Sequence, residues 1–164
     1  MRGAIVDPSA LSMTKFPEHI EDNLYRTIVE NVVIVCVDII LTTDENSFLL
    51  LRRVNEPAKG EWWLPGGRIN KGETVEQAFR RKLKQELSLE GAFVKIVSVE
   101  ETIFDKSIGS PHTINIVGHM QVSHMPLLSL DNQHDAFKWC RNIPRGLHPA
   151  ITNPLRLMGY SYEG

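Results

Sequence analysis

The feature that most constrains the fold of this chain is a loop that passes directly into a capped helix near the middle of the sequence. Gly66 and Gly67 predict a tight turn, and the run from Thr74 to Gln77 has the pattern of a capping box, with Thr74 as the N-cap. One face of the helix that follows is apolar and carries Ala78, Phe79, Leu83 and Leu87. We expect this helix to end near Ser88 and to pack its apolar face onto a larger domain.

The hydrophobic pattern on either side of this helix predicts one α/β domain. Residues 32–41 are apolar on both faces, which is typical of a central strand, and a turn leads to a second strand at 47–54. A helix is expected after Pro17, because apolar residues recur every four positions at Ile20, Leu24 and Ile28. The remaining expected elements are strands at about 93–104, 112–123 and 136–140 and a helix near 149–158. The economical architecture is an α/β/α sandwich with a mixed β-sheet between helices, in one domain spanning 1–164 behind an irregular arm at 1–16.

Charge and composition exclude several classes of function. The formal net charge is −2 and the pI about 6.3, so no basic field is available to hold a nucleic acid. The longest apolar stretch, residues 32–41, is far shorter than the ~20 residues that span a bilayer, and the apolar part of residues 1–8 is too short for a secretory signal. The two cysteines, Cys36 and Cys140, lie far apart, which argues against a disulfide framework or a zinc site. We therefore expect a soluble, cytoplasmic protein.

Segment 67–89 resembles the Nudix box, a motif of the form G-x5-E-x7-R-E-U-x-E-E-x-G-U, where U is a bulky aliphatic residue. The matching residues are Gly67, Glu73, Arg81, Glu86 and Leu89. In that family the box is a loop, a helix and a loop that hold Mg²⁺ or Mn²⁺ against a pyrophosphate, since carboxylates bind hard cations. The resemblance implies the Nudix fold. The simpler interpretation is an ordinary loop and helix with a surface salt bridge between Lys82 and Glu86.

The segment departs from the full box at three positions. Lys82 and Gln85 stand where the full box has glutamates, and Ser88 stands where it has glycine. An ammonium group beside the remaining carboxylate opposes the binding of several divalent ions, so the sequence predicts one metal ion and no cluster. The glutamate that often serves as the base in the full box is also missing, so an enzyme of this sequence needs a base from elsewhere.

Three further stretches resemble the GDP-mannose mannosyl hydrolases, an atypical Nudix branch that also lacks two of the box glutamates. They are residues 48–62, 65–74 and 130–135. The resemblance implies that water attacks the anomeric carbon of a nucleotide sugar and expels intact GDP, whereas ordinary Nudix enzymes attack phosphorus. It also implies one Mg²⁺ per subunit, with Mn²⁺ as a possible substitute. Its ligands would be the backbone carbonyl of Gly66, the carboxylate of Glu86 and the side-chain amide of Gln133.

The same resemblance assigns roles to the other site residues. His134 would be the general base, because an imidazole suits proton transfer near neutral pH. Arg53 and Arg68 would contact the diphosphate, and Arg81 would support Glu86 or the leaving group. Asp38 interrupts an apolar strand, would face the sugar and should have a polar partner. Tyr25 would stack on guanine, with His19 and Ile20 nearby, and the chain is expected to form a homodimer.

Three functions stay open at this point. The first is a GDP-sugar hydrolase that attacks carbon. The second is a conventional Nudix pyrophosphohydrolase that attacks phosphorus in nucleoside diphosphate-X substrates, although Lys82 and Gln85 argue against its metal cluster. The third is a non-catalytic Nudix module that binds a nucleotide or a protein. Two residue assignments stay open as well. Without the resemblance, His134 is interpreted as an ordinary turn residue, and Asp38 has a structural alternative as a buried carboxylate without a role in the site.

Overall fold

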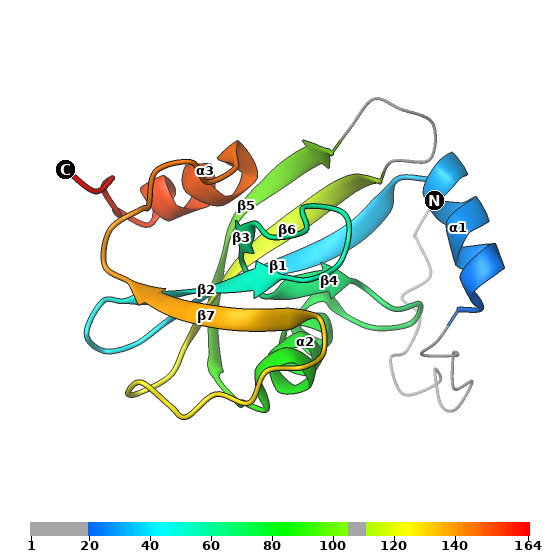
Figure 1. Ribbon diagram of the computed structural model, residues 1–164. Helices are drawn as coiled ribbons and strands as arrows, with labels where there is room; N and C mark the ends of the chain where they lie inside the picture. Colours follow the sequence, from blue (N-terminus) through cyan, green and yellow to red (C-terminus); the bar gives the residue numbers. More distant parts are fainter. Residues whose placement is uncertain (1–19, 105–110) are drawn as a thin grey trace, which may run out of the picture.

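The chain folds into three layers, with a sheet between two helices (Figure 1). The structure is a computed structural model that describes residues 20–104 and 111–164. Helix α2, Val75–Leu87, covers one face of the sheet, and helix α3, Pro149–Leu157, covers the other. Helix α1, Asp22–Asn31, lies beside the end of the sheet where β1 begins. The expected α/β/α sandwich with a mixed sheet is confirmed; the arm at 1–16 lies outside the described residues.

The sheet is built around one central strand. Strand β1, Ile34–Thr42, runs parallel to β6, His112–Gln121, and antiparallel to the short strand β4, Gly66–Arg68. Strand β5, Ala92–Ile103, forms the edge beyond β6. On the other side β2, Phe48–Arg53, pairs with β3, Trp62–Trp63, and with β7, His134–Cys140. The pairs β1–β4 and β2–β7 therefore bring the glycine-rich segment and His134 to the same region of the sheet.

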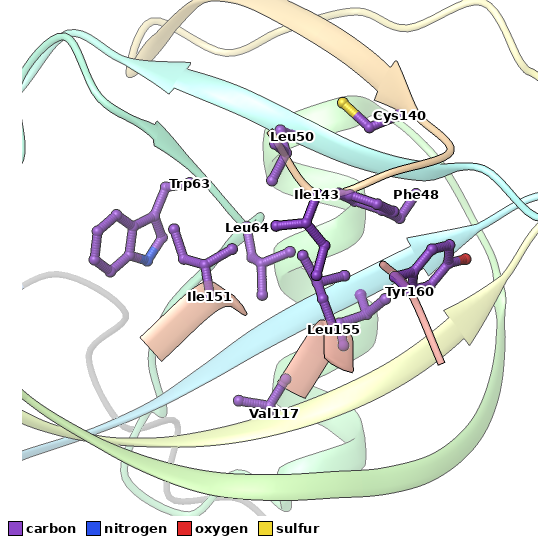
Figure 2. Packing of buried hydrophobic residues seen from close by; sticks show 11 residues of the cluster. Phe48, Leu50, Trp63, Leu64, Val117, Cys140, Ile143, Ile151, Leu155 and Tyr160 are labelled. Atoms are coloured by element: carbon purple, nitrogen blue, oxygen red, sulfur yellow. The ribbon is translucent and has the colours of Figure 1, made fainter. Parts of the chain in front are cut away.

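The alternation of side chains along β1 divides the interior into two cores. Val37, Ile39 and Leu41 belong to the cluster that packs on the apolar face of α2, whereas Ile40 belongs to the cluster under α3. Figure 2 shows the α3-side cluster, in which Phe48 and Tyr160 meet edge to face with their ring centroids 4.7 Å apart. Before Ile40, the same face of β1 carries Asp38, Cys36 and Ile34, and these residues line a cleft. The place where the α3-side core ends is thus where the site begins.

Helix α2 begins and ends as the sequence predicts. The hydroxyl of Thr74 accepts from the Gln77 amide at 3.2 Å, and the Gln77 side chain accepts from the Thr74 amide at 2.8 Å, which completes the capping box. Ser88 ends the helix in the left-handed conformation with φ 55°. Serine therefore takes the conformation that glycine adopts more easily, at a cost of about 1 kcal/mol or more.

Two local expectations differ from the structure. Gly66 and Gly67 do not form a simple tight turn, because Gly66–Arg68 pairs with β1 as strand β4. An added Cβ on Gly66 would clash with the carbonyl of Val37 and the carboxylate of Asp38, so only glycine permits this close approach. Helix α1 begins only at Asp22, with Glu21 as its N-cap, so Ile20 lies before the helix that was expected to include it. The helix has no buried residue, and it lies beside the end of the sheet. The expected homodimer stays a prediction.

No helix within residues 20–104 and 111–164 combines the length and the apolar character that crossing a membrane requires.

Gly118 on β6 lies directly against the ring of Phe79 on α2, and this contact gives a stability test. A Cβ added there would lie under 3.0 Å from three ring atoms of Phe79. We expect Gly118→Ala to lower the free energy of unfolding by about 1–3 kcal/mol, because the packed ring must shift. Urea denaturation measures this loss, which should shrink in a Phe79→Leu background. An equal loss in both backgrounds would show that the ring is not the cause.

Candidate active site

A cleft of about 660 Å³ opens where α1, β1, β4, β6 and the start of β7 meet. Its volume is that of an ordinary small-molecule site. It is lined by eight of the residues selected from the sequence: Tyr25, Asp38, Arg53, Gly66, Arg68, Glu86, Gln133 and His134. These residues are spread over more than a hundred positions of the chain, so their convergence is a property of the tertiary structure.

The carboxylate of Glu86 is buried at the inner end of the cleft and is held by two donors. The ammonium of Lys82, one helical turn earlier on α2, lies 2.8 Å from Oε1. The backbone amide of Gly66 donates to Oε2 at 3.0 Å. The side chain of Glu86 is 2% exposed and that of Lys82 is 12% exposed. The salt bridge expected at the surface is therefore buried, and it joins α2 to β4.

His134 is oriented by a carboxylate. Its Nδ1 lies 2.8 Å from Oδ1 of Asp131, which also accepts from the backbone amide of Gln133 at 3.0 Å. An ionised carboxylate only accepts hydrogen bonds, so Nδ1 is the donor, and in the neutral imidazole Nε2 then carries the lone pair. The imidazole is buried, with its side chain 5% exposed, and it lines the cleft. A fixed imidazole with one free acceptor nitrogen has the form of a general base.

Asp38 is buried and has a polar partner, as its burial requires. The side-chain amide of Asn115 on β6 donates to Asp38 Oδ2 at 2.8 Å, and Asn115 in turn accepts from the hydroxyl of Thr113 at 2.5 Å. Burial raises the pKa of Asp38 from its ordinary value of 3.8 to about 7; the nearby Glu86 charge adds to the rise, and the hydrogen bond from Asn115 opposes it. Asp38 therefore offers a carboxyl group that changes charge near neutral pH.

Arg53 and Arg68 supply positive charge to the cleft. The Nε of Arg53 donates to the carbonyl of Pro57 at 2.8 Å, which fixes the stem of the side chain at the end of β2. The guanidinium of Arg68 lies over the ring of Tyr25, 5.8 Å from its centroid. Guanidinium groups match the geometry of phosphate oxygens, so these two side chains can bind a diphosphate.

The structure places Arg81 against the loop before α2. Its guanidinium binds Glu73 in a two-point ion pair at 2.6 and 2.8 Å. It also donates to the carbonyl of Arg68 at 2.9 Å and to the side chain of Gln85 at 2.9 Å. Positions 81 and 85 share one face of the helix, and Lys82 and Glu86 share the neighbouring face. Arg81 therefore fastens the loop before α2 to the helix and is not among the described residues that line the cleft.

Two residues expected near the base of a nucleotide are not placed in the cleft. Ile20 is described but does not line it. His19 lies outside the described residues.

The sequence did not single out Asn115, Thr113 or Asp131 as site residues. Thr113 and Asn115 alternate with Ile114 and Ile116 along β6, so polar side chains at every second position could have indicated a polar face. Their contact with Asp38 depends on the parallel pairing of β6 with β1, which no local pattern predicts. Asp131 precedes His134 by three residues, a spacing that permits a local hydrogen bond within a turn.

Comparisons with known proteins agree with this geometry. The family model of the NUDIX domain matches residues 33–142, which include every predicted cleft residue except Tyr25. The low-salt glycan biosynthesis protein Agl8 of Haloferax volcanii is 33% identical over 136 residues, covering 80% of this chain and 86% of that protein. The ADP-ribose pyrophosphatase of Methanocaldococcus jannaschii is 36% identical over 112 residues, covering 68% of this chain and 64% of that protein.

Among solved structures, the MutT NUDIX hydrolase of Burkholderia pseudomallei superimposes with a TM-score of 0.66 and 25% sequence identity. The similarity covers 76% of this chain and 96% of that chain.

The raised pKa of Asp38 makes stability depend on pH in a defined direction. The folded state keeps the Asp38 proton up to about pH 7, whereas the unfolded chain releases it near its ordinary value of 3.8. The stabilisation by the neutral carboxyl is therefore full below pH 4 and is lost as the pH rises through 7. In EDTA, we expect the free energy of unfolding of the wild type to fall relative to that of Asp38→Asn between pH 4 and pH 7, by about 1 kcal/mol per pH unit, and the difference to level off above pH 7.

Urea denaturation across this pH range makes the comparison. Asp44→Asn, at an exposed turn position, is the matched control and should run parallel to the wild type. Parallel curves for the wild type and Asp38→Asn would contradict the assignment.

Proposed function

Because the chain belongs to the Nudix family, we propose that it is a hydrolase of a nucleoside diphosphate sugar, with GDP-mannose as the first substrate to test. The observation that carries this proposal is the Asp131–His134 pair in the same cleft as Glu86 and Gln133. Such a pair supplies a base where the box glutamates are replaced. The relative with a name from glycan biosynthesis, Agl8, is consistent with a nucleotide-sugar substrate.

The proposed reaction is attack of water at the anomeric carbon. Nε2 of His134 accepts a proton from water while the water oxygen bonds to the carbon. The bond from that carbon to the diphosphate oxygen breaks, and its electron pair stays on the departing nucleoside diphosphate. The carboxylate of Asp131 stabilises the imidazolium that forms, because it accepts the hydrogen bond from Nδ1. The products are a nucleoside diphosphate and a free sugar with inverted anomeric configuration.

In this proposal, two arginines bind the diphosphate of the substrate, and Asp38 with its partner Asn115 binds the sugar. Arg53 and Arg68 donate hydrogen bonds to diphosphate oxygens and offset the charge that develops on them. The side chains of Asp38 and Asn115 both line the cleft. In this proposal the carboxyl oxygens of Asp38 accept hydrogen bonds from sugar hydroxyls, and the side-chain amide of Asn115 donates to them. Tyr25 provides an aromatic ring for the base of the nucleotide.

The donor set of the cleft fits a single hard cation. The two oxygens of a carboxylate can accept about four hydrogen bonds in all. In Glu86, Lys82 and the Gly66 amide each use one of these positions, so about two remain for a cation. One Mg²⁺, or Mn²⁺ in its place, would be held by Glu86, the side-chain oxygen of Gln133 and the backbone carbonyl of Gly66. When bound, it would neutralise charge on the departing diphosphate. Within the described residues there is no group of three or more His, Cys, Asp and Glu side chains that could hold a metal ion.

A conventional pyrophosphohydrolase is the second candidate function. The similarity to the ADP-ribose pyrophosphatase of Methanocaldococcus jannaschii favours it, because that name implies cleavage of a diphosphate bond. The same His134 could then activate water for attack on phosphorus. The position of the new oxygen atom distinguishes the two reactions.

Hydrolysis in ¹⁸O-labelled water tests the proposed reaction directly. With GDP-mannose and Mg²⁺, we expect GDP and labelled mannose, because the new bond forms at carbon; mass spectrometry of both products gives the answer. EDTA should abolish turnover. GMP and a sugar phosphate, with label on phosphorus, would establish the second candidate function instead. A panel of ADP- and UDP-sugars then defines which base and sugar are accepted.

Loss of the imidazole tests the assignment of the base. We expect His134→Ala to lower kcat by about 10²–10⁴-fold, the usual contribution of a general base. Calorimetric binding of GDP should change little, since the base acts on water. His124→Ala is the matched control, because His124 is exposed and hydrogen-bonds only to the hydroxyl of Ser123 among the described partners. Undiminished kcat in His134→Ala would remove His134 from the mechanism.

A further inference from the structure

We propose that Lys82 determines how the cleft binds a metal ion: its ammonium neutralises Glu86 in the free protein, so a divalent cation binds weakly until a diphosphate is present. This inference rests on the proposed function for one point only, the identification of Glu86 as a metal ligand. It goes beyond that function because it assigns the order and coupling of binding to a residue that has no ligand role itself.

The contact between the two side chains is close and enclosed. Lys82 Nζ lies 2.8 Å from Glu86 Oε1, and Glu86 is 2% exposed. The other carboxylate oxygen accepts from the Gly66 amide at 3.0 Å. Each oxygen of Glu86 therefore already has a donor. A surface pair of the same residue types would be screened by water, but this pair is shielded from solvent.

The stem of Lys82 is held as well as its charged end. A Cβ added to Gly67 would lie 2.6 Å from Lys82 Cε, so the aliphatic stem passes directly against the backbone of β4. The ammonium therefore cannot move away from Glu86 without losing this packing. The absence of a side chain at Gly67 makes room for the lysine, and the strand and the helix together fix the ion pair.

A divalent cation that approaches Glu86 meets a carboxylate whose charge is already compensated. It also meets the positive charge of Lys82, 2.8 Å from Glu86 Oε1, whereas the rest of the cleft carries charges of both signs. Like charges at this range repel strongly where water is excluded. A diphosphate changes this balance, because its negative charge offsets that of the ammonium where it stands and so reduces the repulsion that a cation meets at Glu86. Metal and diphosphate should therefore bind cooperatively, each raising the affinity for the other.

Direct binding of Mn²⁺ to the full-length protein tests the inference without any turnover. Electron paramagnetic resonance measures free Mn²⁺ during titration of the wild type, Lys82→Met and Lys84→Met. Lys84 is the matched control: it has the same charge on the same helix, but its side chain is 73% exposed and 3.7 Å from Glu90. We expect Lys82→Met to bind Mn²⁺ at least ~10-fold more tightly than the wild type, a typical coupling between neighbouring sites, and Lys84→Met to match the wild type. Equal affinity of all three proteins, or equal gains in both variants, would overturn the inference.

A second measurement uses only the wild type, in case Lys82→Met does not fold. Mn²⁺ titrations with and without GDP, corrected for the Mn²⁺ bound by GDP in solution, should show affinity for Mn²⁺ rising at least ~10-fold with GDP. Unchanged affinity would contradict the inference. Product analysis stays separate: label found on phosphorus would reject the proposed reaction but would leave these binding results as they are.

Discussion

The carboxylate of Glu86 joins helix α2 to strand β4 at the inner end of the cleft. It binds Lys82 on its own helix at 2.8 Å and the backbone of Gly66 at 3.0 Å, and it is buried. A buried charge must be compensated. The burial of the Glu86 carboxylate therefore depends on the ammonium of Lys82 and on the backbone amide of Gly66. The Arg81–Glu73 pair fastens the preceding loop to the next face of the same helix. Together these contacts hold the glycine-rich segment in place beside β1.

The parallel pairing of β1 with β6 forms the other wall of the cleft. It brings Asn115 and Thr113 beside Asp38, and the resulting hydrogen bonds make a buried carboxyl acceptable. The α3-side core occupies the same face of the sheet and includes Ile40, the next residue on that face of β1 after Asp38. Apolar packing and polar chemistry thus share one face, and their boundary lies within β1.

The cleft differs from a carboxylate-rich metal centre because charges of both signs line it. Lys82 and three arginines lie there together with four acidic residues, one of which is Glu86, and Gln133 offers a neutral oxygen. Lys82 already pairs with the Glu86 carboxylate, and the guanidinium groups can donate to the phosphate oxygens of an anionic substrate. The proposed base, His134, lies on β7 beside Asp131, so the proposed proton transfer uses a different element from the carboxylate on α2. The arrangement is consistent with Nudix chemistry in which an imidazole replaces a box glutamate.

The sequence by itself determined the elements whose information is local. The capping box at Thr74, the end of α2 at Ser88 and the central strand β1 follow from adjacent residues or short periodicities. The choice of Glu86, Gln133 and His134 as candidate site residues came from the family resemblance, and the structure places all three along one cleft. Strand β4, the burial of the Lys82–Glu86 pair, the pairing of Arg81 with Glu73 and the partner of Asp38 were decided only in the tertiary structure. Each of these depends on how closely two distant backbones approach, and that distance is set by the packing of the whole sheet on α2, which no local pattern contains.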